Sequence, residues 1–464
     1  MMQKLSQYLL RTLFHYQPTE NWMNCELQGL CAIWHNVDAL YVCQGDAQPI
    51  FSWLVLVCGV AYGMIGHEIN SSSSDPNGSS TIGTDGAPFI IYTGKMNTEQ
   101  GHTSRPHRPT SQKEADGNWV FRVGSVIRET NTTRVAYLFK SKHWKHWELV
   151  DNRLYTLPGS GIWECIDFYR PDPSSQNYVL KASLFNTQHD IYALGSYDSA
   201  AHKFIPDNPE LDFFGFESSR YDYGRVYAND SFFEPVKQRH IVLSWVNETD
   251  TEELELQRGW SGFLTIPQTV AVDSKTGVNF INWPIDEVES LRISEQLDME
   301  VFFDYPDVSI DGVVTDEADS MNEQFNCNQG GSAHRGVFGP FGLLVLTDEN
   351  FKEQTAVFFY ISHSGNGQWI TRVCNDETRA SLLPGVDFHV YGNPVHMLPT
   401  EDFLSLCILW KALHGGSLVV TSRVYPTVAI GDLAKLYLFN NGMTPITVRN
   451  ITTWHMSQVI MTPY

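Results

Sequence analysis

The sequence predicts an all-β protein of two domains. Short runs of β-branched and aromatic residues recur along the chain, and Gly, Pro, Asn or Asp bound each run, which is typical of strands and turns. Long amphipathic helical patterns are missing from the sequence. Regularly spaced short strands of this kind form a sandwich, a barrel or a propeller, and the pattern alone does not choose among the three.

The strand candidates extend over both predicted domains. In chain order the clearest are residues 87–94, 134–141, 177–184, 190–197, 240–247, 299–305, 342–348, 355–362, 417–426 and 435–442. A charged connector, ISEQLDM, precedes the run at 299–305. We therefore expect a first domain at residues 1–292, a linker at 293–299 and a second domain at 300–464.

The composition is that of a folded, acidic protein. Charged residues make up 18% of the chain and aromatic residues 13%, which argues against intrinsic disorder. The net charge of −22 argues against a nucleic-acid partner, because phosphate binding needs clustered Lys and Arg. Aromatic faces and carboxylates suit a carbohydrate ligand, although strand and core packing explains most of the aromatic residues.

Signals for the cellular compartment conflict. Acceptor triplets for N-glycosylation indicate a secreted glycoprotein, and they begin at Asn70, Asn77, Asn131, Asn229, Asn247 and Asn450. The opening residues, MMQKLSQYLLRTLFHYQP, contain too short an apolar run for a signal peptide, so we expect no export signal here. The uncharged segment 51–66 is shorter than the ~20 residues of a membrane helix, so we expect no membrane span.

No metal or cofactor is expected. The cysteines lack the spacing of zinc ligands, and the pair His143 and His146 flanks tryptophans, where packing explains it more simply than a ligand role. The sequence gives no indication of the oligomeric state.

A set of segments matches a known family. They are HYQPTENWMN, GNWVFRVGS, LFKSKHWKHWELV, GIWECIDFY, YDYGRVYANDSFFEP, NWPIDEVESLR, GVFGPFGLLVL, EQTAVFFY and TSRVYPTVAIG. These segments closely resemble plant members of glycoside hydrolase family 32, the acid invertases and fructan exohydrolases. The resemblance implies a five-bladed β-propeller, here with an incomplete first blade, followed by a C-terminal β-sandwich. It also implies retaining cleavage of β-fructosyl bonds in sucrose or fructans, and a location in the cell wall or vacuole.

The resemblance assigns one catalytic residue directly. Retaining cleavage needs two carboxylates about 5 Å apart, one to attack the anomeric carbon and one to protonate the leaving sugar. Glu164 in WECIDF matches the family's acid/base. Asp167 follows three residues later, so the alternation of a regular strand places it on the opposite face, and we expect a structural role for it.

Two other carboxylates of the family are missing. After Asn24 the family continues with Asp-Pro-Asn-Gly, which contains the nucleophile, whereas this chain has Cys25 and Glu26. A thiol at its normal pKa in an acidic pocket is a poor substitute, and Glu26 is out of register. A later DPNG at Asp75 is an ordinary turn sequence. The family's Arg-Asp-Pro is represented by Arg108 without the aspartate.

Other positions match binding or structural residues of the family. The substrate-binding candidates are Asn24, Ser79, Arg108, Asp222 and Arg225. A salt bridge between Asp222 and Arg225 is the alternative to sugar binding. The resemblance also places a disulfide between Cys327 and Cys374.

Three hypotheses for function follow. The first is a β-fructofuranosidase or fructan exohydrolase whose turnover suffers from the missing aspartates. The second is a catalytically inactive sugar-binding relative. The third is the product of a misread gene, because in plant members the Asp-Pro-Asn triplet comes from a very small exon.

Overall fold

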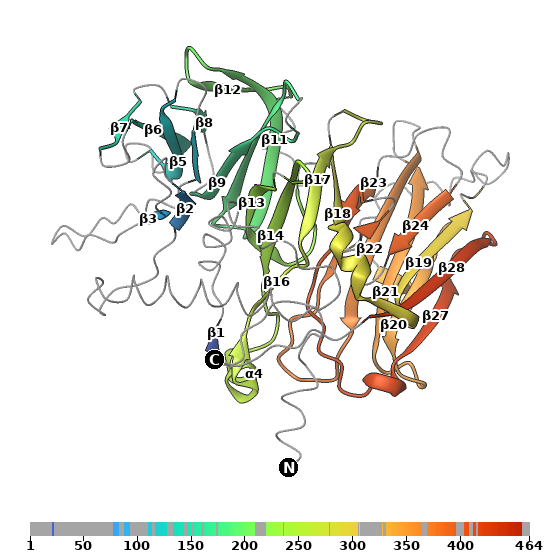
Figure 1. Cartoon of the computed structure of the whole chain (residues 1–464). Coiled ribbons are helices and arrows are strands. Elements are labelled where there is room, and N and C mark those ends of the chain that lie inside the picture. Colours follow the sequence, from blue (N-terminus) through green and yellow to red (C-terminus); the bar gives the residue numbers. More distant parts are fainter. Residues whose placement is uncertain are drawn as a thin grey trace.

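The computed structural model is almost entirely β-structure, as the sequence predicts (Figure 1). It describes residues 21–22, 78–82, 88–92, 110–113, 117–127, 133–142, 146–150, 153–158, 162–172, 175–208, 220–234, 236–277, 279–304, 306, 327, 331–363, 369–395, 403–407, 412–413 and 416–456. Within these ranges one α-helix occurs, α4 (Glu252–Arg258), with the Thr251 hydroxyl accepting from the Leu254 N–H at its start. None of the helices within these ranges is long and apolar enough to cross a membrane.

Three antiparallel sheets follow one another along the first half of the chain. The first contains β4 (Thr110–Lys113), β5 (Trp119–Val126), β6 (Arg134–Ser141), β7 (Glu148–Leu149) and β8 (Tyr155–Leu157). The second contains β9 (Trp163–Tyr169), β10 (Tyr178–Leu184), β11 (His189–Asp198) and β12 (Lys203–Pro206). The third contains β13 (Val226–Glu234), β14 (Arg239–Val246), β16 (Phe263–Leu264), β17 (Gln268–Val272) and β18 (Phe280–Pro284).

These three sheets pack face to face in chain order (Figure 1). Leu138 of the first sheet lies in one buried cluster with Phe168 and Leu180 of the second. Val179, the neighbour of Leu180, points the other way and lies in a cluster with Val242 of the third sheet. The alternation along β10 therefore buries both faces of the second sheet.

Two short pairings lie beside these sheets. Strand β1 (Asn21–Trp22) runs parallel to β15 (Trp260–Ser261), and β2 (Gly78–Ile82) is antiparallel to β3 (Pro88–Tyr92). Within the described residues, the pairing of β1 with β15 connects the start of the NWMN stretch to the rest of the protein.

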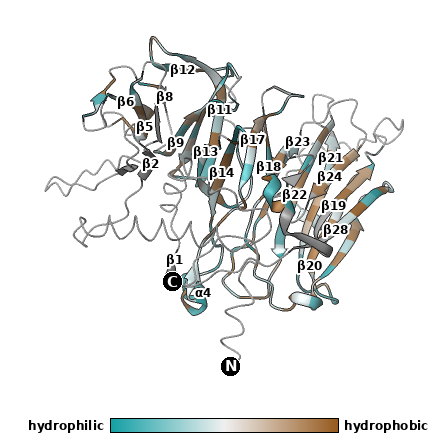
Figure 2. Cartoon of the chain, in the orientation of Figure 1, coloured by the Kyte–Doolittle hydropathy of each residue, from teal (hydrophilic) through white to brown (hydrophobic). Residues whose placement is uncertain are grey.

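Two five-stranded antiparallel sheets make up the distal half. One runs in the order β26 (Leu418–Val419), β25 (Ala412–Leu413), β24 (Phe403–Cys407), β19 (Arg292–Asp304) and β28 (Val448–Met456). The other runs in the order β23 (Val390–Val395), β22 (Trp369–Arg379), β21 (Gln354–His363), β20 (Phe338–Thr347) and β27 (Lys435–Asn440). Side chains from both sheets, among them Phe303, Leu404, Phe341 and Phe359, form one buried apolar cluster. The same strands are rich in brown, hydrophobic positions in Figure 2.

Two expectations about strands need correction. Residues 293–299, expected to be a linker, lie inside β19 and pair with β28 through register shifts. The charged residues of this segment therefore do not mark a break in the strand. The strand expected at 417–426 is limited to β26, because beyond Val419 the backbone hydrogen-bonds to the first half instead: the N–H of Arg225 donates to the Thr421 carbonyl over 2.8 Å.

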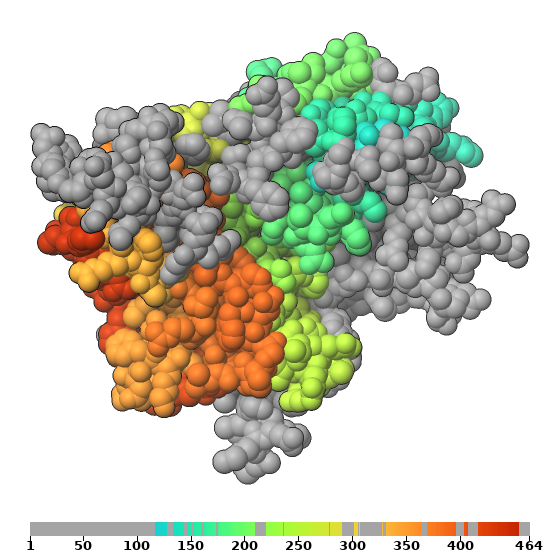
Figure 3. All heavy atoms as spheres, turned by 180° about the vertical axis from the view of Figure 1, so that it is seen from behind, coloured from blue at the N-terminus to red at the C-terminus, as the bar shows by residue number. Residues whose placement is uncertain are grey.

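A buried charged cluster joins the two halves. Glu248 accepts from Arg423 Nε at 3.2 Å and from the Tyr425 hydroxyl, and it lies 3.4 Å from an Arg258 guanidinium nitrogen. Burial raises the pKa of Glu248, but the two guanidinium groups outweigh burial and hold it below its ordinary value. In Figure 3 the orange surface of the distal half directly adjoins the yellow-green surface around α4.

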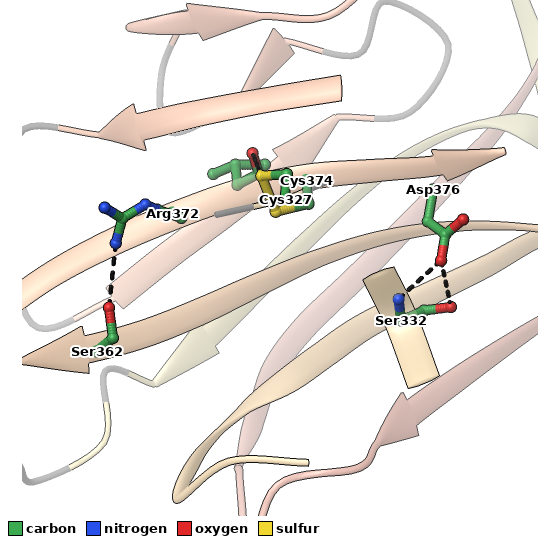
Figure 4. Close-up of a disulfide and its surroundings, with 7 residues drawn as sticks. Cys327, Ser332, Ser362, Arg372, Cys374 and Asp376 are labelled. Atoms are coloured by element: carbon green, nitrogen blue, oxygen red, sulfur yellow. Dashed lines mark hydrogen bonds between the residues drawn. A yellow bond between two sulfur atoms is a disulfide. The ribbon is translucent and has the colours of Figure 1, made fainter. Parts of the chain in front are cut away.

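A disulfide joins Cys327 and Cys374, the pair that the resemblance indicates (Figure 4). Cys374 lies on β22, so the bridge attaches the chain around residue 327 to the sheet. Close by, Asp376 accepts hydrogen bonds from the Ser332 N–H at 2.7 Å and the Ser332 hydroxyl at 2.8 Å.

Candidate active site

Glu164 lies near the start of β9, and its side chain is half-buried. The Tyr227 hydroxyl, from β13 of the next sheet, donates a hydrogen bond to Glu164 Oε2. Beside Glu164 the fully buried Trp163 packs against β5, where Gly124 has no side chain: a Cβ there would lie 2.5 Å from the Trp163 carbonyl oxygen. The third sheet thus holds the carboxyl group of Glu164, and the first sheet packs against the backbone beside it.

A β-bulge interrupts β9 directly after Glu164. Glu164 pairs with Ser183 and Asp167 pairs with Lys181, so two residues of β9 oppose one residue of β10. Cys165, the first of the two, has a φ of 37°, which non-glycine residues rarely adopt. Ser183 and Lys181 are two apart and share a face, so their partners Glu164 and Asp167 share it too.

The sequence prediction for Asp167 is therefore wrong about its face. It assumed a regular strand, and the extra residue of the bulge reverses the alternation. The predicted structural role agrees with the contacts: Asp167 is 6% exposed, and its Oδ2 accepts from the hydroxyl and the N–H of Ser231 on β13.

A second bulge of the same kind occurs in β13, directly after Tyr227. Tyr227 pairs with Trp245 and Asp230 pairs with Leu243, and Ala228 between them has a φ of 55°. Both partners of the Glu164–Tyr227 hydrogen bond thus precede a bulge. Bulges concentrate near active sites because they re-aim a side chain out of the regular alternation.

Tyr227 is a hydrogen-bond donor that the sequence did not single out. Burial raises its pKa, and the negative charge of Glu164 raises it further. The phenol therefore stays protonated and donates to the carboxylate. A tyrosine in a strand reads as an ordinary β-former, and its partner is 63 residues away.

Asp222 and Arg225, expected to contact the sugar, lie where the two halves meet, and their sugar-binding roles stay predictions. Asp222 Oδ1 accepts from the N–H of Gly224 at 2.7 Å and from the N–H of Thr421 at 2.8 Å, so it joins the two halves. The backbone of Arg225 bonds to the same Thr421. Burial and the nearby charges of Arg220 and Arg225 together lower the pKa of His189 to about 4.

A separate cleft of about 200 Å³ lies between the halves and is lined by Tyr192, Arg220, Tyr221, Tyr223, Asn279, Phe280, Asn282, Asn393, Pro394, Gly416, Ser417, Leu418 and Val419. Glu164 does not line it. In the ranges that the structure describes, no three His, Cys, Asp or Glu side chains are placed to hold a metal ion.

Known proteins are similar in sequence to this chain over most of its length. Residues 96–284 match the model of the glycosyl hydrolases family 32 N-terminal domain. The acid beta-fructofuranosidase of Solanum lycopersicum is 32% identical over 536 residues, which cover 96% of this chain and 82% of that protein. Acid beta-fructofuranosidase 4, vacuolar, of Arabidopsis thaliana is 30% identical and covers 98% of this chain, which spans 80% of that protein. The chain belongs to glycoside hydrolase family 32.

Solved structures of family 32 have the same fold. The crystal structure of fructan 1-exohydrolase IIa from Cichorium intybus superimposes on this chain with a TM-score of 0.76 and 24% sequence identity. The match covers 97% of this chain and 98% of the exohydrolase chain. The same protein in complex with 1-kestose matches 82% of this chain and 83% of its own with a TM-score of 0.69 and 25% identity.

Several positions with expectations from the sequence lie outside the described residues. These are Asn24, Cys25, Glu26, Asp75 and Arg108, together with the segment 51–66. Ser79 lies in β2, of which the backbone is described. The substrate-binding roles expected of Asn24, Ser79 and Arg108 therefore stay predictions.

The glycosylation candidates divide by burial. Asn229 is 2% exposed and Asn247 is 6% exposed, so the fold leaves no room for a glycan on either, contrary to expectation. Asn229 lies within β13, and Asn247 directly follows β14. Asn450 on β28 is exposed and stays a candidate. Asn70, Asn77 and Asn131 lie outside the described residues.

Proposed function

We propose that this chain is a β-fructofuranosidase-type member of family 32 that binds β-fructosyl sugars at Glu164 and keeps only the acid/base half of retaining cleavage. The observation that carries the proposal is the Glu164–Tyr227 hydrogen bond at the paired bulges of β9 and β13. A carboxyl group held by a protonated phenol, half-buried between two sheets, is suited to give a proton to a leaving sugar oxygen.

We assign none of the described carboxylates to the attacking half. Asp167 shares the face of Glu164, but it is buried and its Oδ2 is bound to Ser231. After Asn24 the sequence gives Cys25 and Glu26 where relatives have the nucleophilic aspartate, and Arg108 is not followed by one. Without an attacking carboxylate the covalent intermediate of the retaining mechanism does not form.

The substrate class follows from the relatives. Fructan 1-exohydrolase IIa has been crystallised with 1-kestose, and a Bombyx mori family 32 β-fructofuranosidase with sucrose. Sucrose or a short fructan is accordingly the ligand that we assign to this chain. A vacuolar location fits the relatives named vacuolar, and an exposed Asn450 fits passage through the secretory route.

The finer architecture is part of the same proposal. We infer that the three stacked sheets, with β2–β3 and β1–β15, belong to a five-bladed propeller whose first blade is incomplete, and that the distal sheets are a β-sandwich. The stacking of successive sheets in chain order supports the first part, and the shared apolar core supports the second.

Hydrolysis assays test the proposal. The full chain and its Glu164→Gln variant are incubated with sucrose, 1-kestose and inulin, and released fructose is measured alongside binding of 1-kestose by calorimetry. We expect binding, and equal fructose release by the two proteins. Fructose release that depends on Glu164 would overturn the missing-nucleophile part, and Asp75→Asn would then test Asp75 as the nucleophile. Absence of binding would overturn the sugar-binding part.

A misread gene is the second candidate, because the resemblance breaks off directly after Asn24. Sequencing the transcript between the codons for Asn24 and Gly78 tests it. Recovery of Asp-Pro-Asn-Gly after Asn24 would mean that the natural protein contains the nucleophile motif of the family. A transcript that encodes the sequence as it stands would exclude this candidate.

A further inference from the structure

A buried ion pair lies between the second and third sheets, beside the two bulges. Lys181 of β10 and Asp190 of β11 are 0% and 2% exposed, and Lys181 Nζ lies 3.5 Å from Asp190 Oδ1. Ser183 adds its hydroxyl, which accepts from Lys181 Nζ at 2.9 Å and donates to Asp190.

The pair supplies partners for backbone groups that the bulges leave unpaired. A bulge takes its extra residue out of the ladder, so the N–H and C=O groups there need other partners. Lys181 Nζ donates to the Cys165 carbonyl in the β9 bulge at 3.0 Å, and to the Asn229 carbonyl in the β13 bulge at 2.5 Å. Asp190 Oδ2 accepts from the Asn229 N–H at 2.8 Å. One ion pair thus joins both bulges.

These hydrogen bonds fix the direction of the backbone groups in the two bulges, which the stability of the fold alone does not require. Replacing a buried ion pair by apolar side chains is often neutral or stabilising, so the fold does not need Lys181 and Asp190 for their attraction alone. An apolar pair would fill the space, but it would give Cys165 and Asn229 no partner.

We propose that the Lys181–Asp190 pair positions the acid/base: it holds the β9 and β13 bulges in register and thereby sets Glu164 against Tyr227. The inference rests on the proposed function, because Glu164 is the group that it positions. Lys181 and Asp190 act through the bulge backbone, so they are positioning residues and not catalytic ones.

Cys165 offers a built-in reporter of the β9 bulge. Cys165 forms no disulfide and is 7% exposed, so alkylation of its thiol requires a local opening of the bulge. The experiment treats the native full chain with iodoacetamide and follows the Cys165 peptide by mass spectrometry, with urea unfolding of each variant in parallel. The matched control is Arg258→Met, which breaks another buried ion pair of the first half, to Asp250, away from β9.

We expect Lys181→Met and Asp190→Asn to speed alkylation of Cys165 by about tenfold or more, since the opening costs less once the bulge loses its donor or the charge that orients it. Arg258→Met should lower the urea midpoint and leave the rate within about twofold. An unchanged rate in Lys181→Met, or an equal acceleration in Arg258→Met, would overturn the proposal.

A double variant separates positioning from stability. In Lys181→Met/Asp190→Leu the urea midpoint should return toward wild type, while alkylation of Cys165 stays fast because the bulge carbonyl still lacks a donor. Slow alkylation in this variant would show that filling the space suffices, against the proposal. Slower alkylation of wild-type Cys165 in the presence of 1-kestose would report sugar binding separately. If 1-kestose gave no such protection, this would count against the proposed function. The comparison of the variants would still decide the role of the ion pair at the bulges.

Discussion

The two distal sheets bury a large apolar cluster that contains Phe303, Phe341 and Phe359, whereas between the second and third sheets of the first half Lys181, Ser183 and Asp190 are buried beside two bulges. The distal ladders also contain register shifts beside Phe303 and Phe341, but the side chains buried in this cluster are apolar. In the first half the ladders are interrupted at Glu164 and Tyr227, and polar side chains complete them. At these two bulges, buried polar side chains thus accompany irregular backbone geometry.

The largest expected effect is in the distal core. Phe359→Ala removes a fully buried ring that contacts Phe303 and Phe341, so the free energy of unfolding should fall by about 4 kcal/mol. Urea unfolding followed by tryptophan fluorescence measures it. Phe351→Ala, at a ring that is 40% exposed, is the matched control and should cost about 1 kcal/mol or less. Equal losses at both positions would contradict a distal half held by its apolar core.

The disulfide should come next. Replacing Cys327 and Cys374 together by Ala opens a loop with a sequence separation of 47, which should cost about 3 kcal/mol through the larger entropy of the unfolded chain. Urea unfolding of the double variant and of dithiothreitol-treated wild type should give the same midpoint. A wild-type protein that keeps its midpoint after reduction, as verified by mass mapping, would contradict this expectation.

Glu353 is a charged exception in the distal half, and pH tests it. Its buried carboxylate accepts from the N–H groups of Leu382, Thr427, Val428 and Ala429. Burial raises its pKa, but the hydrogen bond from the Thr427 hydroxyl, together with these N–H bonds, outweighs burial and holds the pKa below the ordinary 4.5. The stabilisation is therefore complete above 4.5 and is lost as the pH falls through the lower, folded-state pKa.

Glu353→Gln should consequently cost about 2 kcal/mol at neutral pH, and this difference from wild type should shrink on acidification. Thermal unfolding as a function of pH measures both. Glu252→Gln, at an exposed position on α4, is the control and should show no such pH dependence. A difference that grows on acidification would refute the assignment.

The smallest effect should be at the site itself. Tyr227→Phe removes one donor from the half-buried Glu164, which water replaces, so unfolding should change by less than about 1 kcal/mol. Tyr169→Phe is the matched control: its hydroxyl bonds Tyr221 at 2.6 Å in a buried setting, and its loss should cost more. If Tyr227→Phe cost more than Tyr169→Phe, the site hydrogen bond would be a stability element, and the comparison between the regions would fail.

Sequence reasoning succeeded where the backbone is regular. The strand expected at 134–141 coincides with β6, and strict alternation along β10 places Leu180 and Val179 in different clusters. Hydrophobic periodicity reports this arrangement because one residue in two meets each neighbouring sheet. The resemblance to family 32 supplied what periodicity could not, including the Cys327–Cys374 pair.

It failed where one residue interrupts the alternation or where a partner is remote. No composition signal marks the bulge at Cys165, so Asp167 was placed on the wrong face. The contact of Asp222 with Thr421, which is 199 residues along the chain, has no signal in the sequence either. Tyr227 gave no signal at all, since its role depends on a contact between two sheets.

The segment from Thr421 to Tyr425 has a consequence for modularity. Asp222, Thr249 and Glu248 of the first half all bond to it, and Gly224 lies so close that a Cβ there would be 1.9 Å from the Thr421 carbonyl oxygen. A fragment ending near residue 292 would lose these partners and leave Glu248 facing Arg258 without Arg423. The half that contains Glu164 is therefore not an independent module. If it were excised or fused to another protein, the segment from Thr421 to Tyr425 would have to be included.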